Sequence, residues 1–245
     1  MKLAVVGKGG AGKTTTSAIL ARTLARQGHQ VVALDCDSNP NLGISLGIGE
    51  EETERLIAMR QALDEGEEEH APGWEDLLER FGALGPDGVR LAVVTKIDNP
   101  EPGCPCCGLS TEQLLANVDA PDVVVIADME AGIGTLTRLG SEVVSAVIVV
   151  VEATPKSLEV GTRAVALASE RQLGRLIVVA NRVRGEGDLE VIRAAFPDVE
   201  VVVVPDDPAI VQADRLGLAP LDRSPDAPAV RALVALATSL APVAV

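Results

Sequence analysis

Short runs of consecutive apolar residues alternate with longer amphipathic stretches along most of the chain. Continuous apolar runs of about five residues are typical of strands buried on both faces of a parallel sheet, and apolar positions three and four residues apart indicate helices. The predicted strands are residues 2–6, 30–34, 89–94, 123–128, 147–151, 176–180 and 200–204, and the predicted helices are residues 13–27, 53–63, 74–81, 157–171 and 228–240. This alternation predicts an α/β fold, a three-layer sandwich with a mostly parallel sheet and helices on both faces.

A glycine-rich loop joins the first predicted strand to the first predicted helix. Its residues fit the pattern G-x-x-x-x-G-K-[ST] of P-loop NTPases, in which backbone N–H groups close around phosphate oxygens at a helix N-terminus. Lys13 is then expected to reach the β- and γ-phosphates of ATP or ADP, and Thr14 to ligate Mg²⁺. The residues expected to surround the nucleotide here are Gly9, Gly10, Ala11, Gly12, Lys13, Thr14 and Thr15. A turn that matches by chance is the alternative, but the loop has the strand before it and the helix after it that the motif requires.

Lys8 follows the first glycine and turns the loop into the deviant form K-G-G-x-G-K-T-T. In this box the chain resembles the MinD/ParA/nitrogenase iron protein class of P-loop ATPases. The resemblance implies hydrolysis of the ATP acid anhydride by a homodimer that forms around ATP, with Lys8 crossing the interface to the partner's nucleotide. A solvated loop lysine is the alternative reading of Lys8.

Two carboxylates, Asp35 and Asp37, follow the second predicted strand, at the edge where open α/β sheets hold their ligands. The resemblance implies that Asp37 orients the attacking water. The class usually has proline directly after this aspartate, whereas here Ser38 and Asn39 precede Pro40. An aspartate in this position is otherwise a common turn or cap residue.

The strand 123–128 ends in Asp128, the Walker B arrangement, which predicts a place for this carboxylate in the Mg²⁺ coordination sphere. Residues 129–134 are expected to form a mobile switch in which Gly132 offers its backbone N–H to the γ-phosphate. The resemblance also assigns the adenine side of the site to Asn181, Arg182, Pro205 and Asp206.

At 245 residues, with 47% hydrophobic content, the chain is long enough for a single domain spanning residues 1–245. Residues 50–86 are rich in glutamate and read as an acidic helical insertion that covers the fold or faces a partner. The formal net charge of −15 argues against binding to nucleic acid or to an anionic membrane. We expect a cytoplasmic protein, because the first strand has no signal peptide before it and no apolar run reaches the roughly 18 residues of a membrane span.

Three of the four cysteines, Cys104, Cys106 and Cys107, lie in the loop 100–110, and Cys36 lies apart. Two thiolates on one turn supply half of a tetrahedral shell, so two copies of the chain are needed to complete a four-sulfur site for Ni²⁺ or Zn²⁺. Cys104 and Cys106 are the preferred pair, and Cys104 with Cys107 is the other. A redox C-x-x-C motif and incidental thiols are the competing readings.

Asp128 to Arg138 read D-M-x-A-G-I-x-x-L-T-R, apart from a glutamate at position 130 where a small residue is expected. With the deviant loop and the upstream C-x-C, this segment resembles the CooC family of accessory ATPases. That resemblance implies assistance in nickel insertion into carbon monoxide dehydrogenase or a similar client metalloenzyme. A ParA/MinD-like positioning or partitioning ATPase is the main alternative, and a nitrogenase-iron-protein-like electron carrier is a third.

Overall fold

The computed structural model describes residues 1–67, 74–94, 111–117, 122–130, 134, 136–141 and 143–241. The strands are β1 Lys2–Gly7, β2 Gln30–Cys36, β3 Gly82–Leu84, β4 Arg90–Val93, β5 Val123–Met129, β6 Ala146–Val151, β7 Arg175–Val183 and β8 Glu200–Pro205. The α-helices are α1 Lys13–Arg26, α2 Leu42–Leu46, α3 Glu50–Glu65, α4 Trp74–Phe81, α5 Thr111–Asn117, α6 Pro155–Glu170, α7 Glu186–Ala195, α8 Pro208–Arg215, α9 Pro220–Arg223 and α10 Pro228–Leu240, with short 3₁₀ turns at Pro86–Gly88 and Leu136–Arg138.

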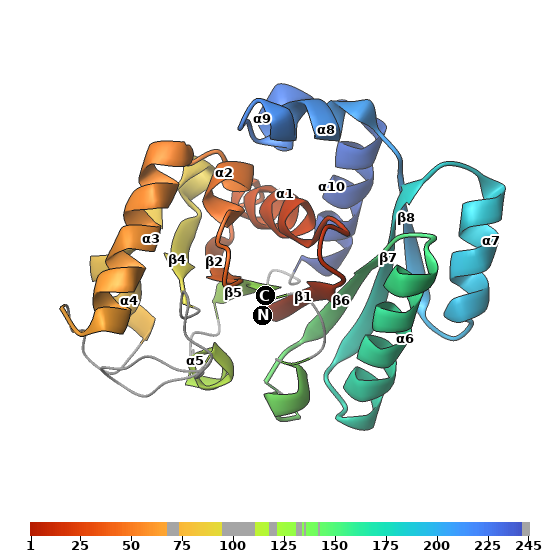
Figure 1. The fold of residues 1–245 in the computed structure, drawn as a ribbon, viewed down its shortest axis with the longest axis horizontal. Coiled ribbons are helices and arrows are strands. Elements are labelled where there is room, and N and C mark those ends of the chain that lie inside the picture. Colours follow the sequence, from red (N-terminus) through yellow and green to blue (C-terminus); the bar gives the residue numbers. More distant parts are fainter. Residues whose placement is uncertain are drawn as a thin grey trace.

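Within the described residues the strands form one sheet in the order β3-β4-β2-β5-β1-β6-β7-β8 (Figure 1). All neighbours run parallel except β3, which pairs antiparallel with β4 at the edge. The parallel arrangement brings the carboxyl ends of β1, β2, β5 and β7 to one edge of the sheet, and the loops that follow these strands build the candidate site.

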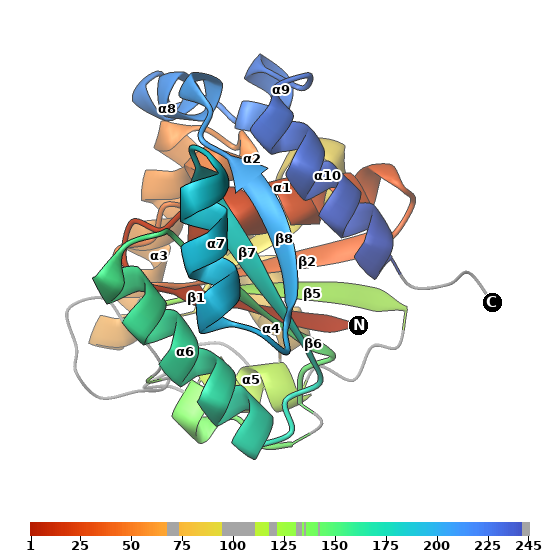
Figure 2. The same cartoon turned by 90° about the vertical axis from the view of Figure 1, so that its right-hand side faces the viewer.

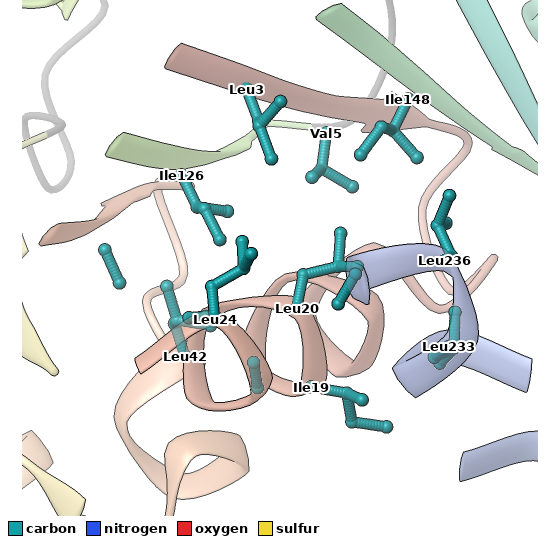
Figure 3. Close-up of a cluster of buried hydrophobic side chains, with 14 of the residues drawn as sticks. Leu3, Val5, Ile19, Leu20, Leu24, Leu42, Ile126, Ile148, Leu233 and Leu236 are labelled. Atoms are coloured by element: carbon teal, nitrogen blue, oxygen red, sulfur yellow. The ribbon is translucent and has the colours of Figure 1, made fainter. Parts of the chain in front are cut away.

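Alternate residues of β1 enter two separate cores, because successive side chains of a strand point to opposite faces. Leu3 and Val5 pack with α1, α2 and α10, whereas Ala4 and Val6 pack with α4, α6 and α7. Figure 3 shows the first core, where Leu20 of α1 and Leu236 of α10 lie beneath the strands. These two cores confirm the predicted three-layer sandwich.

Helix α10 has the predicted bounds, and Figure 2 shows it running from α9 along β8. Its buried face includes Val230, Leu233 and Leu236, as the apolar spacing predicts. Among the helices that the structure describes, none has both the length and the hydropathy needed to cross a bilayer.

The structure contains elements that the sequence pattern did not predict, among them β3, α5, α7 and α8. Gly82, which directly follows the predicted helix 74–81, begins the antiparallel edge strand. The segment 50–86 also does more than cover the fold, because Leu56 of α3 is buried in one core and Phe81 of α4 in the other.

Gly161 of α6 marks a close contact between this helix and the sheet. A Cβ added there would lie 2.5 Å from Cγ1 of Val151 and 3.0 Å from Cζ of Phe196. We expect Gly161→Val to lower the free energy of unfolding by about 1–3 kcal/mol through overpacking, as measured by urea denaturation. Gly187→Ala in α7 is the control, since a Cβ there meets no atom within 4 Å; equal stability of the two variants would contradict this packing.

Candidate active site

The loop between β1 and α1 has the backbone shape of a phosphate cradle. Gly10 and Gly12 have φ values of 78° and 102°, in the left-handed region that favours glycine. The backbone N–H of Ala11 donates to the carbonyl of Lys8 at 3.1 Å, which closes the turn. A Cβ on Gly12 would lie 2.3 Å from Nδ2 of Asn181, so the close approach of β7 also requires glycine there.

A cleft of about 840 Å³ lies over this loop, within the size range of ligand pockets. It brings together Lys13 and Thr14 at the start of α1, Asp37 after β2 and Arg215 at the end of α8. Gly9, Gly10, Gly12 and Thr15 complete the loop side of the cleft. The structure thus places the predicted phosphate-binding side chains beside the aspartate predicted to orient water.

A second pocket adjoins the cleft and contains all four residues predicted to border adenine. They are Asn181, Arg182, Pro205 and Asp206, and Gly12 and Thr15 line the same pocket. Nδ2 of Asn181 donates to the carbonyl of Ala11 at 2.7 Å, which ties the end of β7 to the phosphate loop. The two pockets therefore form one continuous surface, from the position predicted for adenine to the position predicted for the phosphates.

Arg182 lines both pockets and lies in a strained position. Its φ is 54°, in the left-handed region, at an irregularity in the pairing of β7 with β8. Its guanidinium forms an ion pair with Oε1 of Glu152 at 2.5 Å. Glu152, directly after β6, therefore holds the orientation of Arg182, and nothing in its local sequence marked it as part of the site.

Asp128 is buried at the end of β5, directly below the start of α1. Its carboxylate accepts a hydrogen bond from the hydroxyl group of Ser17 at 3.0 Å, and the hydroxyl group of Thr14 favours its ionised form. The positive charge of Lys13 stabilises the ionised form of this carboxylate. Oxygen donors from Thr14 and Asp128 are the ligand type that Mg²⁺ prefers, so the residues present fit this ion. Ser17 was not predicted, although it lies one turn after the motif.

Asp35 corrects the prediction that both carboxylates of the D-x-D segment emerge at the sheet edge. β2 continues to Cys36, so Asp35 lies inside the strand, 1% exposed, in register with Asp128 of β5. Its oxygens accept backbone N–H bonds from Asp37, Asn41 and Leu42 at 3.2, 2.9 and 2.8 Å. Asp35 therefore stabilises the loop that carries Asp37.

Burial perturbs both carboxyl groups of this adjacent pair. Burial, and after it the charge of Asp128, raises the pKa of Asp35 to about 8. Burial also raises the pKa of Asp128 to about 6, although hydrogen bonds from Thr14 and Ser17 and the charge of Lys13 act in the opposite direction. A cation bound beside Asp128 would stabilise the ionised form of this carboxyl.

These shifts predict how stability depends on pH in the protein without Mg²⁺ and nucleotide. Both groups keep their proton to higher pH in the folded chain than at their ordinary value of 3.8. As pH rises from about 4 to about 8 the unfolded chain loses these protons first, so the free energy of unfolding should fall. The variant Asp128→Asn removes one titrating group and one negative charge beside Asp35. We therefore expect its free energy of unfolding to fall less than that of the wild type between about pH 4 and about pH 8. Urea denaturation across this range tests it, with Asp198→Ala, on an exposed loop, as the control; an unchanged slope in Asp128→Asn would contradict the prediction.

Asp37 lines the cleft, whereas the side chain of Lys8 contacts the backbone of its own loop. The carboxylate of Asp37 accepts the backbone N–H of Asn39 at 3.0 Å, and this residue lines the cleft as predicted. Nζ of Lys8 donates to the carbonyl of Gly9 at 3.1 Å, so the side chain folds onto its own loop in this single chain. The role predicted for Lys8 needs a second chain.

The predicted metal cysteines, Cys104 and Cys106, lie outside the described residues, as do Cys107 and Gly132. Cys36 is a free, buried thiol whose pKa is raised by burial first and then by the charge of Asp35. Among the residues that the structure describes, no group of three or more His, Cys, Asp or Glu side chains is arranged to hold a metal ion.

Comparison with known sequences places this site in a family. Residues 3–221 match the CobQ/CobB/MinD/ParA nucleotide binding domain. An uncharacterised ATP-binding protein of Methanocaldococcus jannaschii is 32% identical, over 89% of this chain and 90% of that protein. The carbon monoxide dehydrogenase accessory protein CooC of Rhodospirillum rubrum is 29% identical, over 92% of this chain and 91% of that protein.

Solved structures with low sequence identity share the fold. The cell division ATPase MinD of Pyrococcus furiosus has a TM-score of 0.71 at 22% identity, over 98% of this chain and 97% of that one. The MinC:MinD cell division complex of Aquifex aeolicus gives 0.71 at 21% identity, over 98% and 94%. These likenesses show the fold, and the match over residues 3–221 together with the 32% identical relative shows that the chain belongs to the CobQ/CobB/MinD/ParA nucleotide binding domain family and is an ATP-binding P-loop ATPase.

Proposed function

We propose that this ATPase forms a homodimer around Mg·ATP and couples hydrolysis to metal delivery, with nickel as the cargo and carbon monoxide dehydrogenase or a similar metalloenzyme as the client. The observation that carries this proposal is the 29% identity with CooC over nearly the full length of both chains. The cysteine cluster supports it, because three thiols in one short loop suit a soft or borderline metal ion.

The hydrolytic step needs little covalent chemistry from the protein, so the proposed roles are positioning and charge neutralisation. Lys13 and Lys8 of the partner subunit hold the phosphates, and Gly132 donates its N–H to the γ-phosphate. Asp37 orients the attacking water. Thr14 and Asp128 would hold Mg²⁺, which when bound would supply positive charge beside the phosphate oxygens.

The nucleotide fits one continuous surface of the chain. Asn181, Arg182, Pro205 and Asp206 border the base, and the loop from Gly9 to Thr15 surrounds the phosphates. This assignment is supported by the hydrogen bond between Asn181 and Ala11, which joins the two halves of the site. We also propose that residues 1–245 act as one domain, since α3 and α4 of the segment 50–86 contribute to the same cores as the rest.

Metal binding by the cysteine loop gives the test of this function. We expect about one Ni²⁺ or Zn²⁺ per dimer, held by Cys104 and Cys106 of each chain, with an affinity that differs between the ADP and ATP states because two ligands that share an interface are coupled. Equilibrium dialysis with metal analysis should show that Cys104→Ser/Cys106→Ser loses the metal. Cys107→Ser is the matched control and should keep it, unless the pair is Cys104 and Cys107. If the double variant binds as much metal per dimer as the wild type, the proposed function in metal delivery is wrong.

A ParA/MinD-like positioning ATPase is the second candidate, favoured by the likeness in fold to MinD and to a ParA family ATPase of Chlorobium tepidum with a TM-score of 0.65. Its output would be ATP-dependent binding to DNA, a membrane or a protein partner. The net charge of −15 opposes the first two. ATP-dependent sedimentation with DNA or anionic vesicles, with no metal bound, would favour this candidate.

An electron carrier resembling the nitrogenase iron protein is a third candidate. It would hold an iron–sulfur cluster that bridges two chains. That class uses cysteines from two separated loops of each chain, whereas this chain has one cysteine cluster and Cys36. Purification under anaerobic conditions distinguishes it, because a brown protein with bound iron and sulfide is expected only for this candidate.

A further inference from the structure

Two residues at which the chain departs from the pattern of its class contact each other in the structure. Oγ of Ser38 donates a hydrogen bond to Oε1 of Glu130 at 3.0 Å. Ser38 directly follows Asp37, and Glu130 directly follows β5, the strand that carries Asp128. The contact therefore joins the loop of the proposed water-orienting residue to the start of the segment that leads to Gly132.

The backbone makes this contact a natural continuation of the sheet. β2 and β5 are hydrogen-bonded neighbours, with Asp35 opposite Asp128 and Cys36 opposite Met129. Ser38 and Glu130 lie just beyond the last of these pairs, where the backbone leaves the β2–β5 ladder on each side. Both side chains are exposed, so their positions depend on this contact more than on packing.

The loop of Asp37 is held from a second side by Asp35. This buried carboxylate accepts the N–H groups of Asp37, Asn41 and Leu42, on both sides of Ser38. Between them, Ser38 has no proline ring to fix its φ, and the N–H of Asn39 donates to the Asp37 carboxylate across it at 3.0 Å. The bond to Glu130 restrains the middle of a loop whose two ends Asp35 already holds.

We propose that Ser38 and Glu130 are a pair of positioning residues that keep the Asp37 carboxylate at its working place in the cleft. The inference rests on the proposed role of Asp37 and adds two residues to that mechanism. Glu130 acts here as a hydrogen-bond acceptor and neither as a base nor as a ligand of Mg²⁺. Because this bond is exposed to water, its loss should slow hydrolysis moderately, by about three- to tenfold.

The choice of substitutions separates this role from the alternatives. Ser38→Ala and Glu130→Ala both remove the bond, and each should lower kcat by about three- to tenfold, with KM for ATP changed less than twofold. Glu130→Gln keeps an acceptor oxygen and Ser38→Thr keeps the hydroxyl, so both should remain within about twofold of the wild-type kcat. The double variant Ser38→Ala/Glu130→Ala should be no slower than the slower single variant, since both remove one interaction.

Matched controls are Ser169→Ala in α6 and Glu190→Ala in α7, which replace the same residue types at exposed positions on other helices. Phosphate release with saturating Mg·ATP gives kcat, and thermal denaturation confirms that each variant is folded. Asp37→Ala is measured in parallel. If it hydrolyses ATP normally, the proposed role of Asp37 fails. If it is slow while Ser38→Ala and Glu130→Ala match the controls, only the positioning inference fails. A Glu130→Gln variant as slow as Glu130→Ala would also overturn the inference, because the charge and not the acceptor would then matter.

Discussion

Lys13→Ala should abolish useful ATP binding, with a loss of affinity of about a hundredfold or more. Lys13 is 6% exposed at the floor of the cleft, and its ammonium group is the cation beside the buried carboxylate of Asp128. Charge-assisted hydrogen bonds contribute about 1.5–3 kcal/mol each, so losing two phosphate contacts costs two orders of magnitude or more. Titration with a fluorescent ATP analogue measures the affinity directly.

The control for this variant is Lys156→Ala, which removes the same charge from an exposed position on α6. Lys13→Ala and Lys156→Ala have the same net charge, so any general electrostatic effect on nucleotide binding appears in both variants. Lys13→Ala must also be shown to be folded by circular dichroism. Affinity within tenfold of the control would contradict the assignment of Lys13 to the phosphates.

Asp37→Ala should lower kcat by about 10²- to 10⁴-fold while leaving the affinity for ATP within a few fold of wild type. A residue that acts only on the attacking water contributes to the transition state and not to the binding of the substrate. Its carboxylate accepts the N–H of Asn39 within its own loop, and Asp35 anchors that loop independently. The loss of the side chain should therefore spare the fold.

The same variant should accumulate as an ATP-bound dimer, because slow hydrolysis prolongs the state that holds the two chains together. Light scattering with ATP and with ADP detects the dimer, and a phosphate-release assay gives the rate. Asp198→Ala, at an exposed loop position, serves as the matched control. Normal turnover in Asp37→Ala would remove Asp37 from the mechanism.

The sequence by itself determined the parts of this protein that depend on local order along the chain. The phosphate loop was predictable because its glycines, its lysine and its flanking strand and helix are consecutive, and the left-handed φ values of Gly10 and Gly12 need only those two residues. The buried strands were predictable from continuous apolar runs, and α10 from its apolar spacing. The class resemblance supplied the roles proposed for Asp37, Asp128 and Asn181, which spacing alone leaves open.

Tertiary structure decided which of these segments meet. The register of β2 against β5 puts Asp35 beside Asp128, 93 positions later in the numbering, and converts an expected surface aspartate into a buried one with a raised pKa. Distant parts of the chain are joined in the same way by three side-chain contacts. These are Asn181 with Ala11, Glu152 with Arg182, and Ser38 with Glu130. Strand order and register are set by long-range backbone hydrogen bonds and by the packing of two cores, and neither leaves a pattern in a local stretch of residues.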